Sequence, residues 1–246
     1  MKTLLNTILI IMILGSLLVS CKDKDIRIPA EQRYLSHVTD EKGKKVLEFT
    51  YDEQNRIKAV DFSSPIRFLY GAQGQVEQIF IGANEWRYFY GGDGRPTGYR
   101  FGDDLYQITF SAFENTYTVL PPEGRKQVFY FDELNRCVRW NDVNRSDIYF
   151  FYENKKGPLN NGGFGMANYF GELSVFTFLA QANVLPFPLE AIMSKWAEGE
   201  GYVSFDNTYD SDGFLVKTQQ TVKSTDYVTR EVLETKLSYT YHYKKL

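Results

Sequence analysis

Few side chains in this 246-residue chain could act as nucleophiles, bases or metal ligands. The candidates are two histidines, His37 and His242, and two cysteines, Cys21 and Cys137. Ser–His or Cys–His catalysis needs a histidine within hydrogen-bond reach of the nucleophile. Each histidine falls on an expected strand near one end of the chain, so both are interpreted as packing or surface residues. Cys137 follows a turn and is interpreted as a small core residue. Two histidines and one free thiol cannot form a usual zinc site. The sequence therefore predicts no catalytic residue, no metal site and no cofactor.

Aromatic side chains are the candidate functional groups with a clear mechanism. The chain has 18 Tyr, 19 Phe and 3 Trp. Flat rings on a rigid sheet can stack on the faces of sugars, as they do on other apolar planes. The alternative is that an aromatic column along a sheet forms the hydrophobic core. The residues predicted to bind a ligand are Trp86, Tyr88, Tyr99, Trp140 and Trp196.

The first twenty residues are typical of a secretory signal. Lys2 precedes an apolar stretch, residues 8–14, that is too short and too soon followed by charge to span a membrane. Leu18-Val19-Ser20-Cys21 resembles a bacterial lipobox. That resemblance implies cleavage before Cys21 and its acylation, whereas an ordinary signal peptide with a chance cysteine is the alternative. Each buried methylene of an acyl chain contributes about 0.8 kcal/mol to membrane binding, so several chains make a durable anchor.

Composition limits the partners of the remaining chain. The formal net charge is −3, and loss of Lys2 with the signal makes the mature chain only slightly more acidic. This balance gives no reason to expect nucleic acid as a partner. With Cys21 acylated, Cys137 stands alone and no intrachain disulfide can form.

An aromatic-x-aromatic pair followed by a polar turn recurs about every twenty residues. The pattern is clearest in Phe49-Thr50-Tyr51-Asp52-Glu53-Gln54-Asn55-Arg56-Ile57. Asp at the first turn position can accept a hydrogen bond from the backbone two residues on, and Asn or Gly at the fourth can take a positive φ. The aromatic residues that precede successive turns are Tyr51, Tyr70, Tyr90, Phe110, Phe131 and Tyr152.

Apolar residues alternate before each turn, which indicates strands with one buried face. Residues 33–152 are therefore predicted to form about twelve antiparallel strands in a meander. Open sheets of that size curl or close. The predicted fold class is mainly β: a large antiparallel meander, curled or barrel-like, built of hairpin repeats of about 20 residues.

The repeat of aromatic strands and polar turns is interrupted between residues 153 and 200. A short helical insertion near 165–198 is predicted there, with one helix around Leu173–Asn183 and a second after Pro188 that places Ile192 and Trp196 on one face. The helices would cover an open edge or form a lid over a pocket. The predicted organisation is a signal peptide at 1–20, an acylated tether at 21–32, and a single β domain at 33–246 with an insert at about 157–200.

The Tyr-Asp stretches that start at Tyr51 and Tyr209 resemble YD, or RHS, repeats. The combination of lipobox, aromatic hairpins and helical interruption is similar to an uncharacterised family of Bacteroidetes lipoproteins described as porin-like in fold. This resemblance implies an antiparallel barrel-like sheet and an envelope location, and it carries no known activity. The C-terminal residues Tyr243-Lys244-Lys245-Leu246 lack the closing aromatic residue of an outer-membrane barrel.

The leading interpretation is a non-catalytic lipoprotein of the cell envelope, anchored to the outer membrane through Cys21 on its periplasmic side or at the cell surface. It would bind a glycan, a lipid or an envelope protein. One alternative is a structural scaffold of an envelope complex. Another is a polysaccharide hydrolase, which needs two carboxylates at a set separation. The 31 Asp and Glu residues neither identify nor exclude such a pair.

Overall fold

The computed structural model describes residues 32–124, 126–134, 136–142, 147–157, 159, 190–197, 201–225 and 231–246. All of these residues belong to one compact unit, Glu31–Leu246. The predicted signal peptide, Cys21 and the first predicted helix lie outside the described residues. No helix in the described part of the chain is long and apolar enough to cross a membrane.

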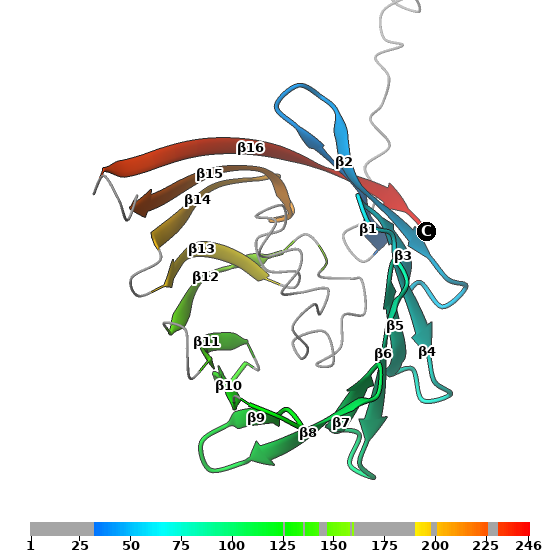
Figure 1. Ribbon diagram of the computed structural model, residues 1–246. Helices are drawn as coiled ribbons and strands as arrows, with labels where there is room; N and C mark the ends of the chain where they lie inside the picture. Colours follow the sequence, from blue (N-terminus) through cyan, green and yellow to red (C-terminus); the bar gives the residue numbers. More distant parts are fainter. Residues whose placement is uncertain are drawn as a thin grey trace, which may run out of the picture. The chain divides into compact units, whose positions relative to one another are not determined.

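Antiparallel strands account for most of the described residues (Figure 1). In chain order they are β1 (Arg33–Asp40), β2 (Lys45–Tyr51), β3 (Ile57–Asp61), β4 (Ile66–Tyr70), β5 (Val76–Ile81), β6 (Asn84–Tyr90), β7 (Pro96–Phe101), β8 (Asp104–Ser111), β9 (Thr116–Leu120), β10 (Gln127–Phe131), β11 (Cys137–Asp142), β12 (Ile148–Lys156), β13 (Glu190–Ala197), β14 (Gly201–Tyr209), β15 (Leu215–Thr225) and β16 (Val232–Lys245). Each strand pairs with the next, and β1 also pairs with β16, so the strand order closes into a barrel. The predicted antiparallel, barrel-like meander is confirmed, and twelve strands fall between Arg33 and Lys156.

The hairpin turns follow the predicted chemistry. At the β2–β3 turn the N–H of Asp52 donates to the carbonyl of Arg56 at 2.9 Å, and the N–H of Asn55 donates to the carbonyl of Asp52 at 3.0 Å. One carboxylate oxygen of Asp52 accepts from the N–H groups of Gln54 and Arg56, both at 2.9 Å. Asn55 has a φ of 61°, and the register shifts at Tyr51. A tight turn followed by a bulge therefore sets the register of the hairpin.

Five tyrosines on even-numbered strands have a second role that the sequence pattern did not reveal. Their hydroxyl groups donate to a carbonyl near the start of the preceding strand: Tyr51 to Leu35, Tyr70 to Ile57, Tyr90 to Val76, Tyr152 to Cys137 and Tyr243 to Leu215. Since a partly buried carbonyl left unpaired would cost free energy, each of these tyrosines stabilises the start of the preceding strand.

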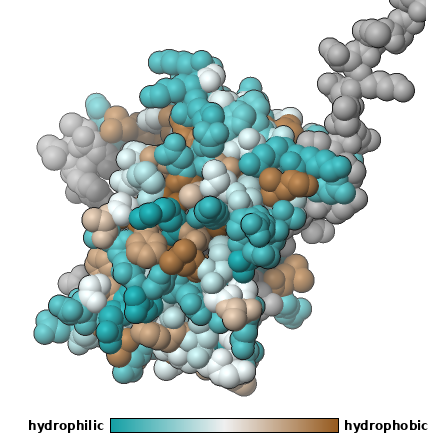
Figure 2. Space-filling view, turned by 90° about the vertical axis from the view of Figure 1, so that its right-hand side faces the viewer, coloured by the Kyte–Doolittle hydropathy of each residue, from teal (hydrophilic) through white to brown (hydrophobic). Residues whose placement is uncertain are grey.

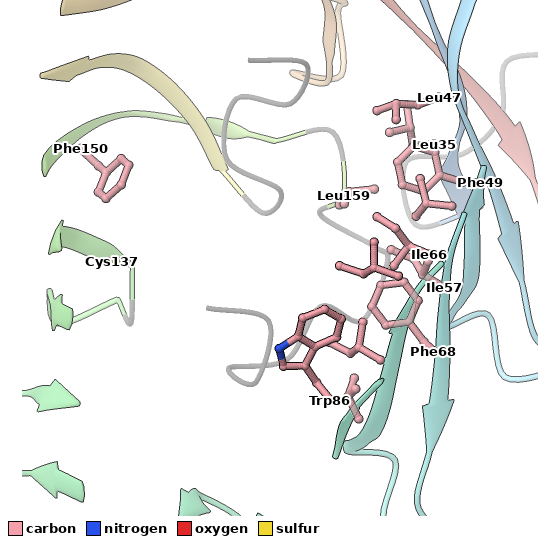
Figure 3. Close-up of a cluster of buried hydrophobic side chains, with 14 of the residues drawn as sticks. Leu35, Leu47, Phe49, Ile57, Ile66, Phe68, Trp86, Cys137, Phe150 and Leu159 are labelled. Carbon is pink, nitrogen blue, oxygen red and sulfur yellow. The ribbon is translucent and has the colours of Figure 1, made fainter. Parts of the chain in front are cut away.

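The core lies on the inner face of the barrel. Leu47 and Phe49 point inward from β2 and Phe68 from β4, and Phe150 points inward from the opposite wall (Figure 3). All four are at most 5% exposed. Side chains along each strand point alternately inward and outward. Those on the outer wall are mixed, with hydrophilic side chains among separate hydrophobic ones (Figure 2). The described strands thus place most of their apolar side chains inside the barrel and most of their charges outside.

The predicted helix after Pro188 is wrong over the described residues. Residues Glu190–Ala197 form strand β13, which pairs with β12 and β14. The spacing of Ile192, Met193 and Trp196 suits a helix, but a short apolar segment does not distinguish helix from strand by periodicity alone. Backbone pairing on both sides decides the outcome here, because each flanking strand offers donors and acceptors that must be satisfied.

Candidate functional site: a groove between β6 and β7

Three of the predicted ligand-binding aromatics lie together, and they are buried. Trp86, Tyr88 and Tyr99 are 2%, 4% and 1% exposed. The ring of Trp86 stacks on that of Phe101 with a centroid distance of 4.6 Å and an interplanar angle of 11°, and Tyr99 stacks on Tyr106 at 4.4 Å. Burial raises the pKa of the Tyr88 hydroxyl well above its usual value, so this ring stays neutral. These rings form the apolar floor under the β6–β7–β8 segment.

The other two predicted residues lie elsewhere in the barrel. Trp140, on β11, is partly buried and stacks on Phe129 at 5.8 Å, and its indole N–H has no hydrogen-bond acceptor in the described part of the chain. Trp196 lies on β13, where the backbone register places it opposite Tyr149 and Tyr202. The side chain of Trp196 lies outside the described part of the structure. The five predicted residues therefore do not form one site.

The two histidines and Cys137 occupy structural positions. His37 and His242 meet where β1 pairs with β16, with their rings stacked at 4.3 Å and 6°. Their separation in sequence conceals this contact, which only closure of the barrel produces. Cys137 is fully buried and free, and burial raises the pKa of its thiol well above its usual value. A thiol in this state is a poor nucleophile.

A surface groove of about 410 Å³ opens beside the buried aromatic floor. It is lined by residues 83–85 and Arg87 from the β6 side and by residues 100–102 from the β7 side. Arg87 stands directly opposite Arg100 in the hairpin register. The turn at Gly91–Arg95 and the register shift that follows it fix this pairing, since a slip of one residue would turn the core side chains outward. We call this feature the β6–β7 groove.

The β6–β7 groove carries two cations and one carboxylate. Glu85 accepts hydrogen bonds from Nε and Nη2 of Arg87 at 3.3 and 3.0 Å. Arg100 is exposed and has no hydrogen-bond or ionic partner among the described residues. Like charges directly opposite each other on neighbouring strands destabilise a sheet. The groove therefore presents an excess of positive charge that the protein's described side chains do not neutralise.

Phe101 borders the groove at the end of β7. It pairs in register with Trp86 and its ring stacks on that buried indole, so the ring lies on the inner face of the sheet, whereas Arg100 points outward. The groove is therefore mainly polar, and its guanidinium and carboxylate groups can hydrogen-bond to one ligand at once. The lining has one carboxylate, whereas glycoside hydrolysis ordinarily uses two. This arrangement suits binding.

A second groove, of about 370 Å³, lies on the same rim, which is formed by the turns that follow odd-numbered strands. It is lined by residues 44–48 and 61–63 and is called the β2–β3 groove below. Lys45 and Glu48 form an ion pair across it at 2.8 Å. Lys44 and Asp61 complete its charged groups. Positive and negative side chains are therefore equal in number in this groove.

A buried polar cluster on β12, β14 and β15 is a further candidate. The hydroxyl of Tyr209 and the amide of Asn207 donate to the carboxylate of Glu153, and Thr218 donates to the amide oxygen of Asn207. Gln220 is fully buried, and neither polar atom of its amide has a hydrogen-bond partner among the residues that the structure describes. Because most of these groups satisfy one another, the β6–β7 groove is the stronger candidate for ligand binding.

No protein-family model matches this chain, and no curated protein matches it in sequence. A solved structure is similar: the crystal structure of a porin-like protein from Bacteroides uniformis, with a TM-score of 0.53. The superposition covers 86% of this chain and 95% of that protein, at 13% sequence identity. At this identity the likeness concerns the fold. The chain is an antiparallel β protein with a porin-like fold.

Proposed function

We propose that this protein is a non-catalytic lipoprotein of the bacterial cell envelope that binds carbohydrate in its β6–β7 groove. The observation that carries the binding role is the placement of Arg87 and Arg100 together with Glu85 in a groove of about 410 Å³. This volume lies within the range of roughly 300–1,000 Å³ that is typical of small-molecule sites.

The chemistry of the groove favours a sugar over a purely apolar ligand. A sugar has hydroxyl groups that can accept from arginine or donate to a carboxylate. Arg87 and Glu85 offer both kinds of partner within one groove. Charge-assisted hydrogen bonds of this type are stronger than neutral ones and fix the orientation of a ligand.

The envelope location rests on the N-terminal sequence and agrees with the porin-like fold of the solved neighbour. Acylated Cys21 would hold the barrel near the outer membrane by its tether, on the periplasmic side or at the cell surface. Replacing Cys21 by serine tests the anchor, because the full-length C21S variant can no longer be acylated there. Metabolic labelling with a palmitate analogue is expected to mark the wild-type protein only, and labelling of both proteins would contradict the anchor.

Binding is tested on the soluble form that begins after Cys21. A glycan array followed by thermal-shift measurements is expected to identify a stabilising oligosaccharide. The N84A variant, which removes an exposed amide from the groove, is expected to weaken that stabilisation. The matched control is S63A in the β2–β3 groove, which should bind like the wild type. Absence of binding across the array would overturn the proposal.

A scaffold of an envelope complex is the second candidate function. The observation that favours it is the exposure of large apolar side chains on β4, β6 and β8: Leu69 is 52%, Phe89 38% and Leu105 44% exposed. Such side chains contribute to protein interfaces when they are contiguous. The scaffold predicts that the L69S/L105S double variant loses crosslinks to envelope proteins in cells, whereas carbohydrate binding predicts that these crosslinks do not depend on the two leucines.

A further inference from the structure

The pairing of Arg87 with Arg100 is the least expected charge arrangement on the described outer wall. Both side chains are exposed, and the register places them opposite each other on adjacent strands. Glu85 engages Arg87 through two hydrogen bonds. Arg100 has no such partner in the described part of the chain. One positive charge therefore remains unbalanced at the mouth of a groove.

An anion placed between the two arginines would remove this repulsion. Arginine presents its donors in a planar fork that matches the two oxygens of a carboxylate. Two guanidinium groups on paired strands can therefore hold one carboxylate from both sides. The amide of Asn84 lines the same groove, so it can hydrogen-bond to hydroxyl groups of the molecule that carries the carboxylate.

We infer that the β6–β7 groove takes an acidic carbohydrate, one that carries a carboxylate as a uronic acid does, with that carboxylate held between Arg87 and Arg100. This inference rests on the proposed carbohydrate-binding function and narrows its ligand class. Glu85 sets the selectivity of the groove, because it occupies Arg87 in the free protein and competes with the ligand for that guanidinium. The carboxylate of the ligand accordingly makes its main contact with Arg100.

The test compares two matched probes on the soluble domain, oligogalacturonate and its methyl ester, by isothermal titration calorimetry at low salt. These probes share the sugar backbone and differ in the negative charge. We expect the acid to bind at least tenfold more tightly than the ester, and its affinity to fall with rising ionic strength.

Two variants test whether the preference for the acid over the ester arises in the β6–β7 groove. R100Q is expected to reduce the affinity for the acid about tenfold and the affinity for the ester by a much smaller factor, because the ester has no charge to pair with Arg100. The control is R67Q, which removes an exposed arginine from β4 on the same wall but outside the groove. R67Q should bind both probes as the wild type does. Since Arg100 is exposed, R100Q should also keep the wild-type melting temperature.

The outcomes separate this inference from the proposed function. Equal binding of acid and ester, or binding of neutral glycans alone on the array, overturns the inference and leaves carbohydrate binding intact. Failure of every glycan on the array, both probes included, overturns both. Equal losses for R100Q and R67Q would show that the acid binds through the overall charge of the wall, which also overturns the inference.

Discussion

The two grooves on one rim of the barrel have nearly the same size but different charge. The β6–β7 groove measures about 410 Å³ and has two arginines against one glutamate. The β2–β3 groove measures about 370 Å³ and has two lysines against one glutamate and one aspartate. Grooves of this size therefore form at the hairpin turns of this rim whatever the charge of their side chains. What distinguishes a candidate binding site is the charge that its side chains leave unbalanced.

The stacked rings near the two grooves also differ. On the inner face of the β6–β7 hairpin, Trp86 stacks on Phe101 and supports the hairpin from the core. Beside the β2–β3 groove the stacked pair is His37 and His242, and His37 is the register partner of Glu48. The first groove therefore combines excess cation with a buried aromatic support, whereas the second combines paired ions with a titratable neighbour.

Truncation of the aromatic floor should have the largest effect. W86A removes a side chain that is 2% exposed and leaves a cavity under Phe101, so we expect a loss of about 3–5 kcal/mol in the free energy of unfolding. Urea denaturation of the soluble domain measures it. The control is F62A in the β2–β3 groove, where the side chain is only partly buried and the loss should be smaller. A loss below about 1 kcal/mol for W86A would show that the floor does not support the groove.

Replacing the glutamate of each groove by glutamine should have the next largest effect and should distinguish the two grooves. E85Q frees Arg87 and is expected to raise the affinity for oligogalacturonate about three- to tenfold, a change of the order of an exposed ion pair. E48Q frees Lys45 in the β2–β3 groove and should leave that affinity unchanged. Calorimetry at low salt measures both. An equal gain for the two variants would remove the distinction between the grooves.

The smallest expected effect is a change with pH in the free energy of unfolding, caused by His37 beside the β2–β3 groove. Burial and the neighbouring His242 hold the pKa of His37 below its usual value of 6.5. The unfolded chain therefore binds a proton more readily than the folded protein does. The contribution of neutral His37 to the free energy of unfolding is fully present above pH 6.5 and is lost as the pH falls below that value. We expect a decrease of less than about 1 kcal/mol between pH 7 and 5.5, because the ring is partly exposed.

The H37N variant isolates that contribution, since asparagine does not titrate. Denaturation of wild type and H37N at matched pH values should show a flatter pH dependence for the variant in this window. Identical slopes would assign the proton uptake to another group. A wild-type protein that becomes more stable as the pH falls to 5.5 would contradict the direction of the shift.

Much of the fold could be predicted from the sequence because the determinants are local. Each turn carries its own Asp and its own Asn or Gly, and each strand carries its own alternation, so strand number and direction follow without long-range information. The helix predicted after Pro188 failed because its apolar spacing is ambiguous and its partners, β12 and β14, are separate segments. Closure through β1 and β16 also depends on a pairing of distant residues.

The candidate site was only partly accessible from the sequence. The prediction of a ligand-binding role for Trp86, Tyr88 and Tyr99 rested on their aromatic rings. Their burial depends on which face of the sheet becomes the inside of the barrel. Arg87 and Arg100 were not selected, because they are thirteen positions apart. The turn at Gly91–Arg95, with the bulge that follows, contained the signal, since counting outward from it places the two arginines opposite each other.

The most direct test of the account is to locate the acidic ligand on the protein. Side-chain Nε–H signals of ¹⁵N-labelled arginine in the soluble domain would be followed during titration with oligogalacturonate. We predict that the signals of Arg87 and Arg100 shift together and saturate at one ligand concentration, while that of Arg67 stays in place. Saturable binding that leaves Arg87 and Arg100 unshifted, or perturbs the backbone around Lys45 instead, would contradict the assignment of the site to the β6–β7 groove.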